Sequence, residues 1–229
     1  MIETRAIMPP EAVRREIEEH ALEKQFHDME QQRETATLGM WIFLMTELLL
    51  FGALFISYTV YRYGHAAGFM DAGTRTSMRL GGIMTALLIT SSFAMATAVH
   101  AAKVDKRKLM LWGLALTILF GVLFLGIKFY EYYDHYQHHE VPGIYFDYPG
   151  RFHDAAKIFF FLYFMMTGLH AVHMTIGLCI VGIMLVRGWR GAFTPAYYTP
   201  VEMTGLYWHF VDIVWIFLFP LFYLLGRYH

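Results

Sequence analysis

The chain alternates between long runs of apolar residues and short polar connections. Five runs are each about 20 residues long or longer, enough for a helix to cross a hydrocarbon layer of roughly 30 Å. They span Leu38–Val60, Leu80–Ala102, Leu109–Tyr130, Ile158–Val186 and Glu202–Leu225. Each run is continuous and lacks the alternation of apolar and polar residues that a membrane barrel shows. The pattern predicts an all-α, polytopic membrane protein: a bundle of five transmembrane helices.

The segment before the first run is highly charged. Within residues 10–34, after two prolines, apolar residues recur every three to five positions: Val13, Ile17, Leu22, Phe26 and Met29. This spacing favours a surface helix, with a solvated tail as the alternative. The segment has no apolar core of a secretory signal, so we expect it to be retained. We divide the chain into an acidic cytoplasmic tail, residues 1–35, and a five-helix membrane domain, residues 36–229.

Composition narrows the class of protein further. Hydrophobic residues make up 57% and charged residues 16% of the chain, whereas soluble domains average about 25% charged residues. The 18 basic and 19 acidic residues give a net charge of −1, so no basic excess is available to bind nucleic acid. Cys179 is the single cysteine, which excludes a disulfide framework and a multi-cysteine metal site.

The distribution of Lys and Arg predicts the orientation in the membrane. With a cytoplasmic N-terminus, the cytoplasmic segments hold eleven of these residues and the outer segments, including Lys128 and Arg227, hold seven. The short connection KVDKRK, residues 103–108, is the strongest indicator under the positive-inside rule. We expect the N-terminus to be cytoplasmic and the C-terminus to lie outside.

Several ionisable residues fall inside the predicted helices. An unpaired charge at membrane depth costs several kcal/mol, so such residues should face the bundle or a partner. Glu47 lies near the middle of the first helix, and His170 and His173, three residues apart, share one face of the fourth. The fifth helix carries three more, and we call the whole set the polar seam: Glu47, His170, His173, Glu202, His209 and Asp212. Each residue could serve a function or simply be hydrogen-bonded within the packing.

The histidines raise the question of a metal or haem site. Two axial haem ligands must face each other at matched depth, but His100 is predicted near the inner end of its helix and His170 and His173 near the middle of theirs. A copper or zinc ligand set is equally hard to assemble. Residues 135–140, HYQHHE, could bind a metal or titrate near neutral pH, although an exposed polar loop is favoured. We therefore expect no catalytic, cofactor-binding or metal-binding residues in this chain.

Five sequence motifs, in order, resemble those of subunit III of haem-copper cytochrome c oxidases. They are MTELLLFGALF around Glu47, TSSFAMATAVHAA, KFYEYYDHY, TGLHAVHMTIG, which is followed by Arg187, and YWHFVDIVWIFLF, with Glu202 seven positions before His209. The resemblance runs from about Gly39 to the C-terminus and is most specific in the last two helices. The chain lacks the two N-terminal helices of the seven-helix form and resembles the shorter bacterial members.

The resemblance implies a subunit without redox centres. In that family haem and copper lie in subunits I and II, which reduce oxygen and pump protons, while subunit III packs on subunit I, binds phospholipid and supports proton uptake and stability during turnover. It also implies that Arg187 is a lipid ligand and that the chain lies in a bacterial inner membrane. The polar seam could fix helix packing, hold lipid headgroups or tune local protonation. Membership of a respiratory supercomplex stays open.

Two other functions compete with this interpretation. The same fold could be an accessory subunit of a quinol oxidase or a nitric-oxide reductase, and only the neighbouring subunits would reveal the electron donor. A proton- or ion-coupled transporter could use Glu47 and Asp212 as relay carboxyls. Against the transporter, the sequence shows no inverted repeat and no pair of helices broken by Gly or Pro.

Overall fold

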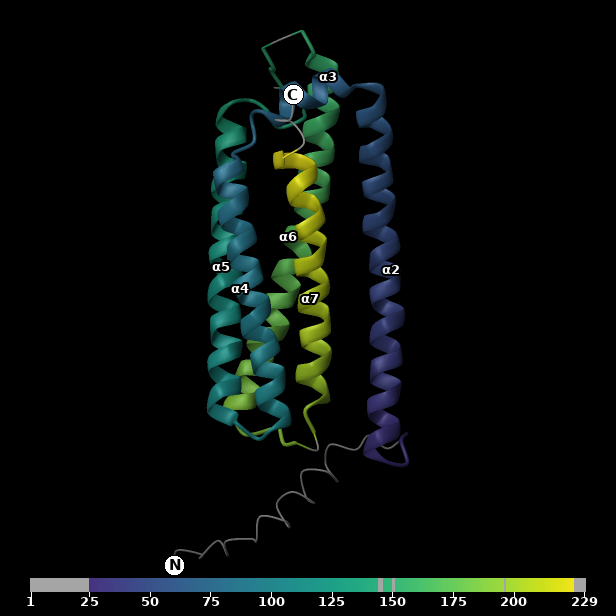
Figure 1. The fold of residues 1–229 in the computed structure, drawn as a ribbon, viewed down its shortest axis with the longest axis vertical. Helices are drawn as coiled ribbons and strands as arrows, with labels where there is room; N and C mark the ends of the chain where they lie inside the picture. The colour runs from purple at the N-terminus through teal and green to yellow at the C-terminus, as the bar shows by residue number, and fades with distance from the viewer. Residues whose placement is uncertain (1–24, 144–145, 150, 196, 225–229) are drawn as a thin grey trace, which may run out of the picture.

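Five long helices run side by side and form a bundle (Figure 1). The structure is a computed structural model and describes residues 25–143, 146–149, 151–195 and 197–224. The long helices are α2 (Met29–Gly64), α4 (Met78–Lys103), α5 (Arg107–Gln137), α6 (His153–Trp189) and α7 (Thr199–Phe219). The other helical elements are a short helix α3 (Ala66–Gly73) and a π-helical turn (Pro220–Leu224). The described residues contain no strand. The prediction of an all-α bundle with five membrane-spanning helices is confirmed.

Helix α2 begins well before its apolar run. The Asp28 side chain accepts a hydrogen bond from the Gln31 amide at 2.7 Å and so caps the first turn. The helix then continues without interruption through residues 35 and 36, where the sequence analysis divided the chain. The remainder of the predicted surface helix, before residue 25, lies outside the described residues.

The bundle is closed most tightly between α4 and α5. Gly113 on α5 faces α4 so closely that an added Cβ would lie 2.8 Å from the Ala94 carbonyl oxygen and 2.8 Å from the Ala98 Cβ. Close approach at small residues is a common way for membrane helices to associate, because apolar side chains gain little by leaving lipid for protein. The turn between these helices contains Asp105 with a φ of 58°, a left-handed conformation that Asp tolerates better than most residues.

Helix α2 is attached to the bundle along a narrow stripe. Its buried residues are Leu44, Phe51 and Tyr58, seven positions apart, and it packs against α6, α7 and α3. The Tyr58 hydroxyl donates to the Leu221 carbonyl at 2.6 Å and so ties α2 to the C-terminal turn. The rest of α2 presents apolar side chains outward, including Leu49, which is 73% exposed. This helix therefore offers most of its surface to lipid or to a partner.

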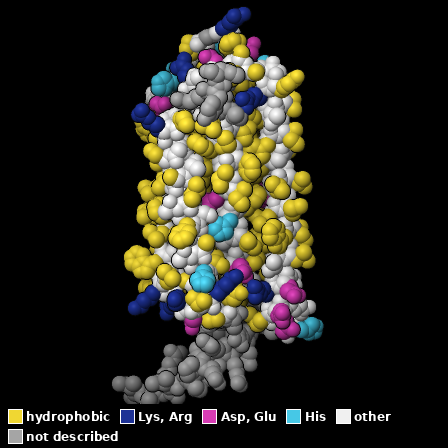
Figure 2. All heavy atoms as spheres, in the orientation of Figure 1, with side chains coloured by type: hydrophobic (Ala, Val, Ile, Leu, Met, Phe, Trp, Pro, Cys, Tyr) yellow, Lys and Arg dark blue, Asp and Glu magenta, His cyan; other side chains and the backbone are white. Residues whose placement is uncertain are grey.

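The molecular surface separates by polarity along the helices. Hydrophobic side chains cover the middle of the face shown in Figure 2, and charged side chains gather toward both ends. Histidine and acidic side chains nevertheless appear in the middle of this face, over α4 and α7.

Candidate functional site

Glu47 and His173 form an ion-pairing contact between α2 and α6. His173 Nε2 lies 2.9 Å from Glu47 Oε2, and the two side chains are 10% and 16% exposed. His173 Nδ1 lies 2.9 Å from the Leu169 carbonyl oxygen, so this nitrogen carries a proton and donates it. His173 Nε2 faces the Glu47 carboxylate, which is the hydrogen-bond acceptor whenever Nε2 carries a proton. The contact therefore places a carboxyl and an imidazole of two different helices at hydrogen-bond distance.

His170 occupies a different environment from its neighbour His173. It is 1% exposed and lies between the rings of Phe124 and Trp215, with ring centroids at 5.6 Å and 5.3 Å. Neither ring nitrogen has a hydrogen-bond partner among the described residues. His170 and His173 therefore have different neighbours, although both are buried residues of α6.

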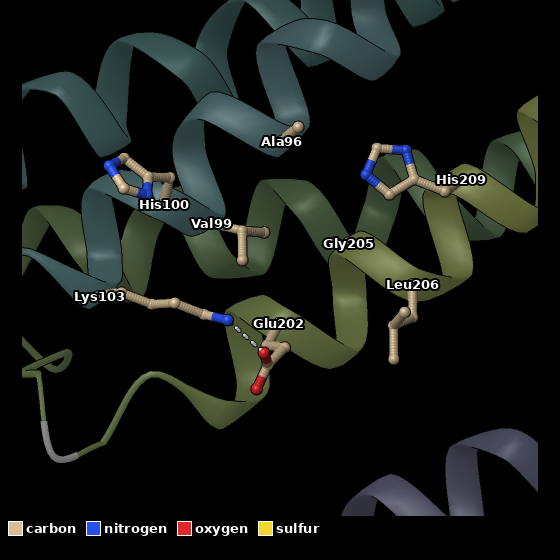
Figure 3. A pocket seen from close by; sticks show the side chains of 8 residues that line it. All are labelled: Ala96, Val99, His100, Lys103, Glu202, Gly205, Leu206 and His209. Carbon is tan, nitrogen blue, oxygen red and sulfur yellow. Dashed lines mark hydrogen bonds and ion pairs between the residues drawn. The ribbon is translucent and has the colours of Figure 1, made fainter.

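Glu202 lies at the start of α7, where it joins three helices. Its carboxylate accepts from Lys103 Nζ at 2.6 Å and lies 3.6 Å from Arg33 Nε. The Tyr198 ring lies beneath both cations, 5.3 Å from the Arg33 guanidinium carbon and 5.2 Å from Lys103 Nζ. In Figure 3 the Lys103 side chain reaches from α4 to Glu202, across a pocket of about 300 Å³ that also includes His100 and His209. This cluster ties α2, α4 and α7 together at one end of the bundle.

His209 and Asp212 lie farther along the same face. His209 Nδ1 is 2.7 Å from the Ser92 hydroxyl of α4. Asp212 is 4% exposed, and its carboxylate lies beside the Ser92 hydroxyl without a hydrogen bond of good geometry. Ser92, His209 and Asp212 line one cavity of about 390 Å³ between α4 and α7. The members of the polar seam therefore occupy separate sites: Glu47 with His173, His170 alone, Glu202 with cations, and His209 near Asp212.

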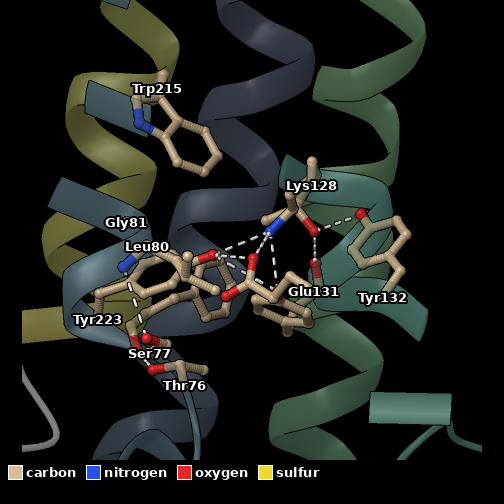
Figure 4. Close-up of polar contacts among 12 residues, drawn as sticks. Thr76, Ser77, Leu80, Gly81, Lys128, Glu131, Tyr132, Trp215 and Tyr223 are labelled. Atoms are coloured by element: carbon tan, nitrogen blue, oxygen red, sulfur yellow. Dashed lines mark hydrogen bonds and ion pairs between the residues drawn. The ribbon is translucent and has the colours of Figure 1, made fainter. Parts of the chain in front are cut away.

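A buried ionic cluster was missed in the sequence analysis. Lys128 Nζ donates to Glu131 Oε2 at 2.9 Å, to the Tyr163 hydroxyl at 2.8 Å and to the Tyr223 hydroxyl at 3.0 Å. Lys128 and Glu131 are only 2% and 3% exposed, and Tyr223 also donates to Glu131 Oε2 at 2.6 Å (Figure 4). The sequence analysis placed Lys128 among the cations of the outer polar segments. That placement is wrong, because Lys128 lies within α5 and its side chain is buried inside the bundle. Opposite charges three residues apart within a hydrophobic run were the available signal.

The cluster continues toward the end of α5. His135 Nδ1 lies 2.6 Å from Glu140 Oε2, and both residues are buried. The predicted exposed loop is therefore wrong for His135 and Glu140, although His138 and His139 are exposed. The misjudgement arose because α5 extends to Gln137, several residues beyond the apolar run, and carries His135 into the bundle.

A tyrosine outside the membrane-spanning helices closes the same end. The Tyr148 hydroxyl donates to Asp71 Oδ2 of α3 at 2.8 Å, and the Arg75 guanidinium carbon lies 5.6 Å from its ring centroid. Burial, together with the hydrogen bond to Asp71 and the charge of that carboxylate, raises the pKa of Tyr148 to about 12. The phenol thus stays a hydrogen-bond donor over the whole neutral range and holds residues 146–149 against α3.

Arg187 lies near the end of α6 that approaches the Glu202 cluster. Its guanidinium carbon is 5.5 Å from the centroid of the Phe193 ring. Within the described residues it forms no ion pair with a carboxylate. Among the same residues there is no group of three or more His, Cys, Asp and Glu side chains that could hold a metal ion.

The comparisons with known proteins agree on one family. The sequence model of the family described as "Cytochrome c oxidase subunit III" matches residues 11–227. The chain is 35% identical over 189 residues to "Cytochrome c oxidase subunit 3" of Alkalihalophilus pseudofirmus, covering 82% of this chain and 86% of the relative. It is 36% identical over 203 residues to "Quinol oxidase subunit 3" of Bacillus subtilis, covering 86% and 92%. The family match begins earlier than Gly39 and includes part of the acidic segment.

Proposed function

The chain belongs to the cytochrome c oxidase subunit III family, and we propose that it is the membrane subunit of a haem-copper oxidase that carries no redox centre itself. The observation that carries this proposal is the family match over residues 11–227. In the proposed complex, haem and copper are held by subunits I and II, and this chain packs on subunit I. We place it in a bacterial plasma membrane with the N-terminus in the cytoplasm and the C-terminus outside.

The electron donor of the proposed complex is a property of the neighbouring subunits. Relatives of similar identity are named as subunits of a cytochrome c oxidase and of a quinol oxidase. A quinol oxidase is therefore the second candidate, and a copper-binding subunit II would identify cytochrome c as the donor. A nitric-oxide reductase or a transporter has no comparable support among these relatives.

Support for proton uptake is the first of two specific roles that we propose. The Glu47–His173 contact places a carboxyl and an imidazole at hydrogen-bond distance, and both remain 10% or more exposed. Such a pair can accept a proton at one group and release it from the other. We propose that it buffers protons beside the pumping subunit and so prolongs turnover.

Phospholipid binding at Arg187 is the second role. A guanidinium can bind a phosphate through two parallel hydrogen bonds, whereas Lys acts as a point charge. Arg187 lies near the end of a membrane-spanning helix, where phosphates of a bilayer lie. A positive-inside anchor is the simpler alternative, and it predicts that Lys would serve equally well.

Native mass spectrometry of the whole complex tests the lipid role. We expect the Arg187→Ala complex to lose a phospholipid that the parent retains, and Arg187→Lys to retain less of it than the parent. Arg190→Ala, at an exposed position three residues later, is the matched control. Equal phospholipid retention in the parent and in both Arg187 variants would show that Arg187 is only an anchor.

Purification of the chain from its native membrane tests the broader proposal. Solubilised in mild detergent, the tagged full-length chain should co-purify with a haem-containing subunit I and show oxygen reduction with cytochrome c or quinol. The chain expressed alone should show no Soret band and bind no stoichiometric iron or copper. Isolation of the native chain without any oxidase subunit, or a haem spectrum from the chain alone, would refute the assignment.

A further inference from the structure

The side chains of His170 on α6 and Glu131 on α5 hold buried polar atoms that have no hydrogen-bond partner among the described residues. In His170 these are both ring nitrogens, and in Glu131 the atom is Oε1. The two residues are 1% and 3% exposed, so bulk solvent does not reach these atoms. Buried polar atoms cost free energy unless they are hydrogen-bonded. Buried water is a common partner for such atoms in proteins.

His170 lies about one helical turn from the ion pair of Lys128 and Glu131. The ring of Phe124 contacts His170, with centroids 5.6 Å apart, and Lys128 follows Phe124 by four residues, or about 6 Å, along α5. The Trp215 ring lies beside both, since its centroid is 5.3 Å from that of His170 and 5.4 Å from Lys128 Nζ. Figure 4 shows Trp215 next to the ion pair. One water bridges polar atoms about 5–6 Å apart, because each of its hydrogen bonds is about 2.8 Å long. The gap therefore has the size that one or two waters span.

Toward the middle of the bundle, His170 is followed by the contact between Glu47 and His173. His173 lies three residues after His170, about 4.5 Å farther along α6 and on a neighbouring part of its surface. Its Nε2 is 2.9 Å from Glu47 Oε2. Water that binds at His170 thus lies between this contact and the ion pair.

Toward the end of α5, the ion pair is followed by a second hydrogen-bonded contact. His135 lies one turn after Glu131, and its Nδ1 is 2.6 Å from Glu140 Oε2. Glu140 Oε1 lies 4.0 Å from Nε of Arg75, whose side chain is 45% exposed. This end of the series therefore reaches the surface of the bundle.

We propose that buried water binds at His170 and at Glu131 Oε1. This water completes a proton path between the surface at Glu140 and the Glu47–His173 contact. The inference rests on the proposed function and deepens it, because it names the side of the membrane with which that contact exchanges protons. Under the predicted orientation this is the outer side.

The groups along the path are of the kinds that pass protons. A carboxylate or a neutral imidazole takes up one proton and releases another, and water and tyrosine hydroxyls do the same by exchanging donor and acceptor roles. A proton that enters at the Glu140 carboxylate therefore ends on the Glu47–His173 contact, with every group between them restored. Lys128 does not carry the proton, because its three donors are bonded within the cluster, to Glu131, Tyr163 and Tyr223.

Water fits these positions better than an ion or a group from outside the chain. Among the described residues, no set of three or more His, Cys, Asp and Glu side chains could hold a metal ion. A monovalent ion would disturb an ion pair that is already neutral, that of Lys128 with Glu131. A lipid or a partner side chain cannot reach His170, which is buried between Phe124 and Trp215.

A cryo-EM structure of the whole complex, at a resolution that shows ordered water, tests the binding sites. We expect water within hydrogen-bond distance of a His170 ring nitrogen and of Glu131 Oε1. His170→Phe keeps a planar ring and removes both nitrogens, so the water at this position should be lost while that at Glu131 is retained. A parent map with ordered water elsewhere in the complex but none at His170 would overturn the inference.

Infrared spectroscopy of the complex in sealed vesicles tests the path. The signal of interest is the carboxyl absorption that disappears in Glu47→Gln. We expect this signal to follow a pH change on the side of Glu140 and not a change on the opposite side. In His170→Phe the response should be about a hundredfold slower, the lower end of the range for loss of a proton-transferring side chain. His100→Phe, at an exposed position on α4, is the matched control and should respond like the parent.

His170→Gln separates proton transfer from packing, and it replaces His170→Phe if that variant does not assemble. The Gln amide can hydrogen-bond to water but does not titrate. We therefore expect the water at position 170 to remain and the infrared response to stay slow. A purely structural role of His170 predicts instead that Gln restores the parental response.

Three outcomes of the infrared experiment would overturn the path. They are a response as fast in the His170 variants as in the parent, a response only to pH on the side opposite Glu140, and no response to pH on either side. The role of the Glu47–His173 contact in turnover is measured separately, by the lifetime and pumping of the Glu47→Gln complex. Failure of that role and failure of the path are therefore distinguished.

Discussion

A single hydrogen bond joins Glu47 on α2 to His173 on α6. Glutamine at position 47 keeps the length of the side chain and can still hydrogen-bond to His173 Nε2, but it cannot take up or release a proton. We therefore expect Glu47→Gln to assemble into the complex and to shorten the period of sustained turnover or lower proton pumping.

The measurement is oxygen consumption and proton release by the purified complex over many turnovers. Glu34→Gln, at an exposed position on the same helix, is the matched control and should behave like the parent. A Glu47→Gln complex with parental pumping and parental lifetime would argue against a proton-linked role. Loss of assembly would instead assign Glu47 a structural role in the contact between α2 and α6.

Lys128 presents the opposite case, a buried charge whose partners all lie within the chain. Removal of one partner of a buried ion pair typically costs about 3–5 kcal/mol, because the other charge is left uncompensated. Lys128→Met should therefore lower the thermal stability of the subunit strongly. The double variant Lys128→Met with Glu131→Leu should recover much of the loss, because it removes both charges.

Thermal unfolding of the purified complex, followed by loss of this subunit, checks the expectation for Lys128. Lys157→Met, at an exposed position near the start of α6, is the matched control and should leave the transition almost unchanged. Equal stability of Lys128→Met and the parent would mean that the ionic cluster contributes nothing to the packing.

At the scale of the elements, hydropathy identifies the helices of this chain but not their contacts. Both α2 and α7 contain an 18-residue window apolar enough to cross a membrane, yet only 11% of that window is buried in α2 against 50% in the C-terminal span. Lipid tails are as apolar as a protein core, so a buried Leu and a lipid-facing Leu give the same sequence signal. The sequence therefore predicts that α2 crosses the membrane but not that it binds through Leu44, Phe51 and Tyr58.

The polar residues show the same division between what was predictable and what was not. Glu47 and His173 stood out because each interrupts an apolar run, and the structure brings them together. Their pairing required the relative rotation of α2 and α6, which no periodicity encodes. His135 and Glu140 were misjudged because helices extend beyond the hydrocarbon layer, so the end of an apolar run does not mark the end of a helix.

Close helix packing yields a prediction that compares two glycines of one helix. A Cβ at Gly113 would lie 2.8 Å from the Ala94 carbonyl oxygen, whereas a Cβ at Gly126 would meet nothing within 4 Å. Gly113→Ala should push α4 and α5 apart and cost about 1–3 kcal/mol, the usual range for overpacking. Gly126→Ala should be neutral or slightly stabilising, because Ala favours helix over Gly.

The two glycine variants are compared by thermal unfolding of the complex and by the fraction of chain that assembles. Their difference is the informative quantity, since both substitutions add one methyl group to α5. If both variants unfold at the same temperature as the parent, the approach of α4 and α5 is not constrained at Gly113.

For the whole molecule, the orientation in the membrane stays a prediction from the distribution of Lys and Arg. Burial of Lys128 in α5 removes it from the outer-segment count, so the balance becomes eleven to six for a cytoplasmic N-terminus. The ends of α4 and α6 and the starts of α2, α5 and α7 then share the cytoplasmic side. Lys106 and Lys108 are exposed there, in or next to the short turn between α4 and α5, and Lys157 is exposed near the opposite end.

A membrane-impermeant lysine reagent distinguishes the two orientations. Applied to intact cells, it should label Lys157 and spare Lys103, Lys106 and Lys108, because the last three face the cytoplasm under the positive-inside rule. Applied to everted vesicles, the same reagent should label Lys106 and Lys108 and spare Lys157. Lys103 should react more slowly than Lys106 even there, because its amine is engaged with Glu202 at 2.6 Å. Ready labelling of Lys106 and Lys108 in intact cells, with Lys157 protected, would mean that the orientation is inverted.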